Sequence, residues 1–239
     1  MGTIDFLALS PHPDDAELFC GGLLARAKRE GHSTAIVDLS EGELSTRGDV
    51  AQRRTESVRA GAILNLDYRS NLGLPDGNLA NTPENRLTVI HAIRELRPKI
   101  CLLPYGQDRH PDHEAAAQLS RSAVYQAGLR KINDGQEIYR PATVLFYMLH
   151  RIFIPSFVVD ISPDMETKMA ALHVYQSQFF NPDQQENTYI SRPEFLESLV
   201  TRARFYGQQI NCQYGEPYFF DGTLKIDNVL DFFAYTIIL

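Results

Sequence analysis

The sequence contains the tripeptide His-Pro-Asp twice, each time between a short apolar run and a helical stretch. The first copy lies in residues 10–17 and follows the apolar run 4–9. The second lies in residues 109–114 and follows the run 100–104. A buried strand, a tight polar turn and a helix are typical of the carboxyl edge of a parallel sheet, where open α/β folds bind ligands. Because two such junctions on one sheet open at the same edge, their side chains can converge on one site.

Strand and helix signals alternate along the chain as far as residue 130. This alternation predicts an α/β, Rossmann-like fold, with a mostly parallel sheet and helices on both faces, in a single domain over residues 1–239. The apolar tail 232–239 is expected to be buried against this domain or against a neighbouring subunit. The predicted strands lie near residues 4–9, 34–39, 68–72, 100–104, 143–148 and 157–161, and the predicted helices near 16–30, 50–64, 83–96, 114–129, 162–177 and 193–207.

The two junctions carry the residue types of a metal site. His12, Asp15 and His113 would make a site with three nitrogen and oxygen ligands and a fourth position for water, which is typical of catalytic zinc. A lone histidine in a turn would be explained by local hydrogen bonds. Acids and histidines gathered at two sheet-edge junctions would cost desolvation and repulsion unless a cation were present. Imidazole favours zinc over magnesium, and iron(II) stays open because two histidines and a carboxylate also make the iron site of oxygenases.

The paired motifs resemble the PIG-L-type (LmbE-like) zinc-dependent N-acetylglucosaminyl deacetylases, and the layout is most similar to the bacillithiol-biosynthesis branch. The resemblance implies a hydrolase that removes the acetyl group from an N-acetylglucosaminyl compound, such as N-acetylglucosaminyl malate. It implies that Zn²⁺ is bound by His12, Asp15 and His113, that Asp14 is the general base, and that His110 assists at the transition state. Alternatives are a deacetylase of chitooligosaccharides or another small amide, and a non-catalytic protein that binds metal or sugar.

Other residues near the motifs receive roles from this interpretation. Asp112, two residues from His110, is the candidate to orient that histidine and balance its charge. Many family members have Glu directly after the paired aspartates, whereas Ala16 intervenes here, so Glu17 is given no role in the chemistry. The other histidines lie away from both motifs and are expected to have no catalytic role: His32, His91, His150 and His173.

The substrate-binding candidates come from other loops at the same edge. Arg53 and Asp76 are expected to hydrogen-bond sugar hydroxyls, by resemblance to polar sugar-contact positions in the family. The alternatives, a surface salt-bridge residue and a turn aspartate, are equally open. Glu43 and Arg109 are further candidates for substrate binding.

Composition limits the class of partner. The formal net charge is −7, which argues against nucleic acid as a partner because a phosphate backbone calls for a basic surface. No apolar run approaches the roughly 20 residues that span a bilayer, and no basic segment marks a signal peptide at the N-terminus. Three widely spaced cysteines without a Cys-x-x-Cys pair indicate reduced thiols. We therefore expect a cytoplasmic protein without membrane contact, a small-molecule N-acetyl amino sugar as substrate, and a homo-oligomer such as a hexamer.

Overall fold

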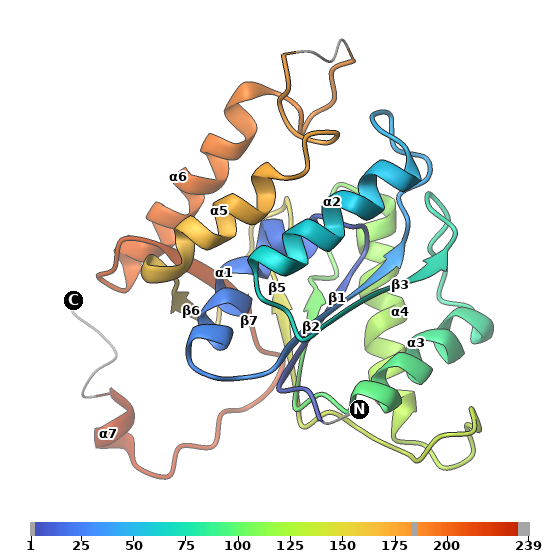
Figure 1. Cartoon of the computed structure of the whole chain (residues 1–239). Coiled ribbons are helices and arrows are strands. Elements are labelled where there is room, and N and C mark those ends of the chain that lie inside the picture. The colour runs from blue at the N-terminus through green and yellow to red at the C-terminus, as the bar shows by residue number, and fades with distance from the viewer. Residues whose placement is uncertain (1–2, 183–185, 234–239) are drawn as a thin grey trace.

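The computed structural model of the chain describes residues 3–182 and 186–233. Its centre is one seven-stranded sheet (Figure 1). In chain order, the strands are β1 (Phe6–Ser10), β2 (Thr34–Ser40), β3 (Tyr68–Leu74), β4 (Ile100–Pro104), β5 (Thr143–Tyr147), β6 (Phe157–Asp160) and β7 (Gly215–Phe219). Across the sheet their order is β3-β2-β1-β4-β5-β7-β6. The first five in this order are parallel, and β7 is antiparallel to both of its neighbours, so the predicted mostly parallel α/β fold is confirmed.

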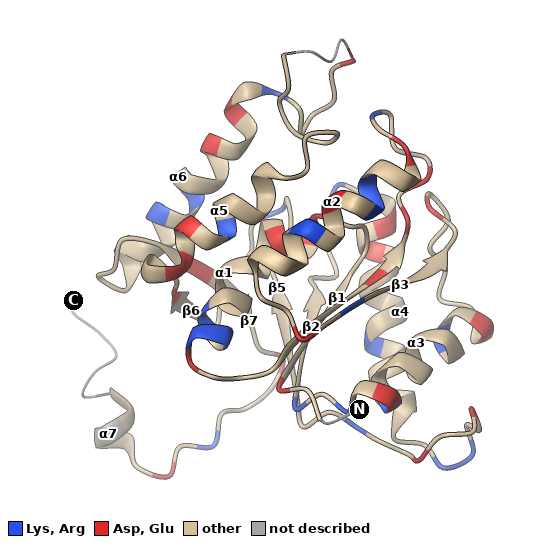
Figure 2. Cartoon of the chain, in the orientation of Figure 1, with Lys and Arg blue, Asp and Glu red and all other residues tan. Residues whose placement is uncertain are grey.

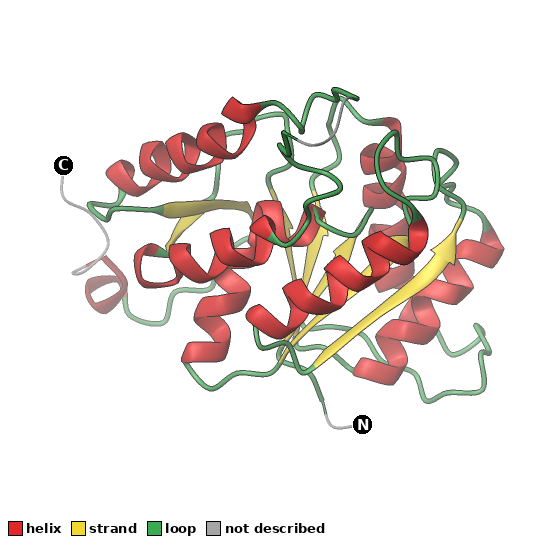
Figure 3. Cartoon of the chain, turned by 45° about the horizontal axis from the view of Figure 1, so that its top comes forward, coloured by secondary structure: helices red, strands yellow, loops and turns green. Residues whose placement is uncertain are grey.

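Helices cover both faces of the sheet, as the turned view of Figure 3 shows. One face is covered by α3 (Pro83–Leu96) and α4 (Pro111–Ala127). The opposite face is covered by α1 (Asp15–Arg29), α2 (Val50–Ile63), α5 (Met165–His173) and α6 (Pro193–Gln209). A short 3₁₀ turn (Ser162–Asp164) precedes α5, and α7 (Val229–Phe233) follows β7. Among the described residues, none of these helices combines the length and the apolar character needed to cross a membrane.

The central strand β1 holds the two layers together. Leu7 and Leu9 point into the core under α3 and α4, whereas Ala8 points into the core on the opposite face. A parallel strand covered on both faces is apolar at every position, which explains why the run before the first motif has no polar alternation. The turn that carries the first motif therefore follows directly from the buried end of β1.

A close approach of α1 to β7 explains the glycine in the middle of that helix. The N–H of Gly22 donates to Oε1 of Glu216 at 2.8 Å, and a Cβ built on Gly22 would lie 2.8 Å from the same oxygen. Lys168 of α5 pairs with this carboxylate at 2.6 Å. Because any larger side chain would separate α1 from β7, glycine is required here despite its low helix propensity.

The C-terminal part of the chain is where the predictions fail. Strand β7 was not predicted, because the segment after Cys212 is rich in aromatic residues and has no clear strand or helix pattern, and Pro217 is unusual in an inner strand. The structure tolerates this proline because β5 pairs only with Tyr218 and Phe219. Phe232 and Phe233 are 43% and 52% exposed in the single chain, so they are not buried against their own domain, and the alternative of burial against a neighbouring subunit stays a prediction. Residues 234–239 of the predicted tail lie outside the described residues. The predicted helix 162–177 is also shorter, as the bounds of α5 show.

Candidate metal centre and active site

The site lies where the strand order of the sheet reverses. From β1 the chain continues to β2 and β3 on one side, and from β4 it continues to β5 on the other. Such a switch point leaves a crevice at the carboxyl ends of the two central strands. The first motif follows β1 and the second follows β4, so Asp15 lies in the first turn of α1 and His113 in the first turn of α4.

Three ligand atoms converge in this crevice. Oδ2 of Asp15 lies 3.1 Å from Nδ1 of His12 and 3.2 Å from Nε2 of His113, and all three residues are buried. A tetrahedral zinc with bonds of about 2.0–2.2 Å would place its ligand atoms roughly 3.3–3.6 Å apart, slightly farther than the separations found here. The distances and the donor set of two imidazoles and one carboxylate therefore fit a divalent metal ion. Burial lowers the pKa of His113, but Asp15 and Asp108 outweigh it and raise that pKa to about 9.

Two carboxylates contact the ring nitrogen of His12 that faces away from Asp15. Nε2 of His12 lies 3.1 Å from Oδ1 of Asp76 and 3.3 Å from Oδ2 of Asp112. Because these contacts occupy Nε2, they orient the ring with Nδ1 toward Asp15 and His113. Carboxylate–histidine pairs of this kind fix the tautomer and the basicity of a metal-binding imidazole.

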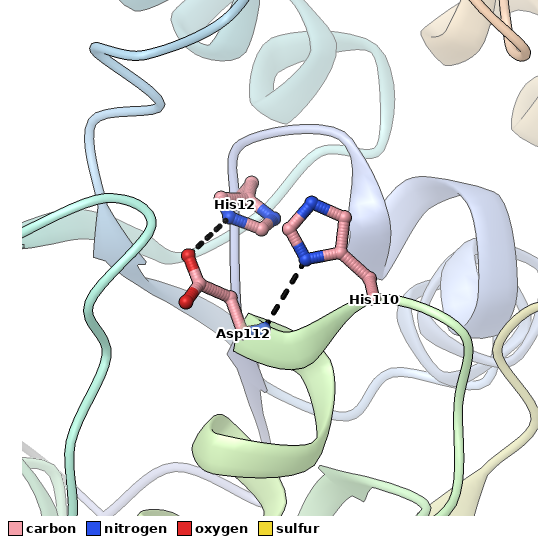
Figure 4. Close-up of side chains that lie close together, drawn as sticks. All are labelled: His12, His110 and Asp112. Carbon is pink, nitrogen blue, oxygen red and sulfur yellow. Dashed lines mark hydrogen bonds and ion pairs between the residues drawn. The ribbon is translucent and has the colours of Figure 1, made fainter.

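The position of Asp112 differs from the prediction. Its carboxylate contacts His12, not His110 (Figure 4). It also accepts the backbone N–H groups of Gly77 and Leu79. It is the backbone N–H of Asp112 that donates to Nδ1 of His110, at 3.2 Å. The reason is helical geometry: His110 is the N-cap of α4 and Asp112 is its second residue. Successive side chains on a helix diverge by about 100°, so the carboxylate points toward the loop after β3.

Capping gives His110 a defined tautomer. Because its Nδ1 accepts the N–H of Asp112, the proton of the neutral ring is on Nε2. Burial and the neighbouring rings of His113 and His12 lower the pKa of His110, which favours this neutral form. The residue therefore offers one N–H donor beside the ligand atoms.

Asp14 lies next to the three ligands but is held by a different partner. Its carboxylate is 2.8 Å from Nη2 of Arg53, and both side chains are buried. Burial raises the pKa of Asp14 to about 7, and the Arg53 guanidinium opposes this rise. The backbone of Asp14 has φ 121°, an unfavourable value for a residue with a Cβ. Backbone strain of this kind is common at functional sites. Here it occurs at the N-cap of α1, the residue whose carboxylate contacts Arg53.

Asp108 and His150 belong to the site, although neither was predicted. Oδ1 of Asp108 lies 3.1 Å from Nδ1 of His113, and Oδ2 of Asp108 accepts the backbone N–H of His150 at 2.8 Å. The ring of His150 stacks on that of His113, with centroids 5.5 Å apart. Asp108 is two residues from His110 in the same loop, which was a usable signal. The other histidines that were expected to have no catalytic role are exposed: His32, His91 and His173.

A cavity of about 290 Å³ opens over these groups. Of the substrate-binding candidates, Arg53, Asp76 and Arg109 line it. Glu43 is exposed and accepts the backbone N–H of Asp76 at 2.8 Å, so it contacts a lining residue. The Arg109 guanidinium lies 3.7 Å above the ring of Tyr189, a lining residue that no sequence signal indicated. Basic and acidic residues are interspersed along the helices around the site (Figure 2).

The fold and the site define a deacetylase-type α/β protein with a candidate metal centre, and comparisons with known proteins agree. The family model of GlcNAc-PI de-N-acetylase (PIG-L) matches residues 7–124, which include both motifs. The chain is 30% identical over 225 residues to a diacetylchitobiose deacetylase of Thermococcus kodakarensis, covering 88% of this chain and 80% of the relative. The chain therefore belongs to the PIG-L family of deacetylases, as the paired motifs predicted.

Two other relatives complete this comparison. The structure of a conserved protein from Thermus thermophilus is 42% identical with a TM-score of 0.86, covering 94% of this chain and 98% of that one. The probable N-acetyl-alpha-D-glucosaminyl L-malate deacetylase 2 of Bacillus subtilis is 26% identical over 189 residues, covering 72% of this chain and 82% of the relative. Relatives of both the chitobiose and the malate type are thus similar to this chain.

Proposed function

We propose that the chain is a zinc-dependent hydrolase that removes the N-acetyl group from small N-acetylglucosaminyl compounds. The observation that carries this proposal is the convergence of three ligand atoms beside a carboxylate, Asp14, that is outside the ligand set. A protein that only bound metal or sugar would not need that carboxylate or the N–H donor of His110. The two relatives that act on N-acetylated sugars support the substrate class.

The proposed chemistry follows from the groups in the crevice. A zinc ion held by the three ligands would lower the pKa of a bound water to about 7. Asp14 accepts the proton that water loses as it attacks the acetyl carbonyl, and His110 donates a hydrogen bond from Nε2 to the developing oxyanion. Asp14 then passes the proton it took from water to the leaving nitrogen, the C–N bond breaks, and acetate and the free amine are released, while His110 stays neutral.

Two substrates of this class are favoured by different observations. The match to the chitobiose deacetylase is longer and more identical than the match to the malate-type relative, which favours chitooligosaccharides. The cationic Arg109 at the cavity favours an acidic aglycone such as malate. Arg53, Asp76 and Arg109, which line the cavity, are the proposed sugar contacts, with Glu43 acting through its bond to Asp76.

A fluorescamine assay for free amine tests the proposal against diacetylchitobiose, N-acetylglucosaminyl malate and N-acetylglucosamine. Release of amine by the zinc-loaded protein from at least one compound is expected. Asp14→Asn should retain zinc and lose about 10²–10⁴-fold in kcat, because the proton acceptor is removed. Asp15→Asn should instead weaken zinc binding and recover partly with added zinc. The matched control is Asp49→Asn, because Asp49 is exposed and asparagine keeps the N-cap of α2.

The outcomes of this assay are distinct. Amine release from none of the three sugars, by protein with about one bound zinc, would overturn the proposed activity. If Asp14→Asn were the variant rescued by zinc, and Asp15→Asn the zinc-loaded inactive one, the two roles would have to be exchanged.

A further inference from the structure

We infer that His150 is a specificity-determining residue that hydrogen-bonds a hydroxyl group of the aglycone, and that the aglycone selected in this way is a second sugar. This inference rests on the proposed function, because it concerns the substrate of the same cavity. It assigns a role to a histidine that was expected to have none in catalysis.

The ring of His150 is held in place by its neighbours, but its nitrogens are left for a ligand. It lines the cavity, stacks on His113 with centroids 5.5 Å apart, and lies nearly perpendicular to the ring of Phe19 at 5.3 Å. Among the described residues, the one hydrogen bond of His150 is that of its backbone N–H to Asp108. Both ring nitrogens remain accessible. Because the ring is already ordered, little side-chain entropy is lost when it binds a substrate group.

His150 lies on the opposite side of the crevice from two of the proposed sugar contacts. It follows β5, whereas Asp76 follows β3 and Arg53 lies on α2, between β2 and β3 in the chain. In the strand order β3-β2-β1-β4-β5, the metal ligands at the ends of β1 and β4 lie between these two groups. A sugar bound by Arg53 and Asp76 therefore leaves the β5 side of the cavity for the rest of the substrate.

The chemistry of the substrate indicates which part contacts His150. The acetyl methyl group cannot hydrogen-bond, and the acetyl oxygen is assigned to the metal and to His110, so the aglycone remains. Above its ordinary pKa of about 6.5, an imidazole has one N–H donor and one acceptor, which complements a hydroxyl group because a hydroxyl both donates and accepts. A carboxylate could use only the donor.

A second aromatic residue lies at the same end of the cavity. The ring of Tyr189 is 5.8 Å from that of His150, and Tyr189 is 46% exposed. An aromatic ring of this kind offers an apolar surface next to the polar nitrogens. A second sugar has both hydroxyl groups for His150 and an apolar C–H face for Tyr189, whereas malate has only carboxylates and a short carbon chain.

The first test is His150→Phe in the amine-release assay, because phenylalanine keeps a ring against His113 but has no nitrogen. KM for diacetylchitobiose should rise about 5- to 10-fold, the usual effect of one neutral hydrogen bond, with kcat little changed. KM for N-acetylglucosamine and for N-acetylglucosaminyl malate should change less than about twofold, because neither contains a second sugar. An equal change for diacetylchitobiose and N-acetylglucosamine, a change confined to the malate compound, or no change at all would overturn the inference.

A second variant separates the hydrogen bond from the ring. The amide of His150→Gln has a donor and an acceptor, so KM for diacetylchitobiose should stay within about threefold of the wild-type value. The matched control is His173→Gln, an exposed histidine of α5, which should behave as the wild type. If His150→Phe lost zinc affinity about tenfold or more with the KM values unchanged, His150 would only support His113, and the inference would be overturned. If His150→Phe does not fold, the comparison of His150→Ala with His150→Gln provides the same test.

A binding measurement keeps the two proposals distinguishable. In zinc-loaded Asp14→Asn, turnover is blocked, so calorimetry with diacetylchitobiose and with N-acetylglucosamine measures affinity alone. Adding His150→Phe should lower the affinity for diacetylchitobiose about 5- to 10-fold and leave that for N-acetylglucosamine unchanged. If the wild type deacetylates none of the sugars, the proposed activity fails, but this difference in affinity would still support the contact. Unchanged affinity for diacetylchitobiose, or binding of neither sugar, would overturn the inference.

Discussion

Replacing Asp108 with Asn should weaken zinc binding about 10- to 100-fold, the usual effect of losing a carboxylate behind a metal-binding histidine. Oδ1 of Asp108 accepts hydrogen bonds from Nδ1 of His113 at 3.1 Å and from the backbone N–H of His110 at 3.0 Å. Its Oδ2 accepts the N–H groups of His150 and Arg151, at 2.8 and 3.2 Å. An amide NH₂ cannot accept, so either orientation of the asparagine leaves two of these donors unpaired. Each buried unpaired donor costs about 1–3 kcal/mol.

The assay must separate metal affinity from stability. Zinc affinity would be measured by competition with a chromogenic chelator, at a temperature well below the melting temperature of the variant. Asp134→Asn is the matched control, because Asp134 is also a buried carboxylate but pairs with Arg94 away from the site. The control should lose stability and keep its zinc affinity. An unchanged affinity in Asp108→Asn, or an equal loss in both variants, would refute the proposed link between Asp108 and the metal ligand.

Four further predictions test the site, the fold and the assembly. His113→Ala should hold far less than one zinc per chain, and full occupancy by elemental analysis would contradict the ligand assignment. Arg94→Ala should lower the free energy of unfolding by about 3–5 kcal/mol, measured with urea, because Arg94 is buried and pairs with a carboxylate and three carbonyl oxygens. Hydrogen bonds from the Lys99 side chain and from the Ser33 backbone lower the pKa of Asp5 from 3.8 to about 2. Ionised Asp5 therefore stabilises the fold above about pH 4. This contribution is lost as the pH falls through 2. Asp5→Asn should thus cost about 1 kcal/mol at pH 7 and much less near pH 2, and an equal cost at both values in thermal melts would exclude the pairing. Light scattering should report a particle larger than the 27.0 kDa chain, whereas a monomer at micromolar concentration would contradict the predicted homo-oligomer.

The convergence of His12, Asp15 and His113 could be predicted because it depends on local geometry and one topological rule. A parallel strand ends at a known edge, and a helix that begins one turn later presents its first residues there. The same rule applies to His150, which follows β5 by three residues and lies at the same edge. It was set aside because no motif surrounds it. The rule needs only the strand and its direction, so a polar residue just after any of the parallel strands is a candidate for the site.

The partners of these residues could not be predicted from spacing. Asp112 and His110 are two residues apart, yet their side chains diverge, and the carboxylate reaches His12 from the other junction. Arg53 was predicted to contact the sugar and it lines the cavity, but its bond to the carboxylate of Asp14 was not indicated by spacing. In both cases the partner comes from a distant part of the chain. The decisive quantity is the path of a loop, which residue types alone do not determine.

The carboxylates of the site explain why a cation belongs there. Five are in contact with the ligand histidines or with Arg53: Asp14, Asp15, Asp76, Asp108 and Asp112. Backbone N–H groups stabilise four of them, since Asp15, Asp76, Asp108 and Asp112 each accept at least one. Arg53 pairs with Asp14, whereas the side-chain partners of Asp15 are the two imidazoles of His12 and His113. A divalent ion at that point balances the remaining charge and satisfies both rings, so metal binding and the stability of the two junctions are expected to be one coupled equilibrium.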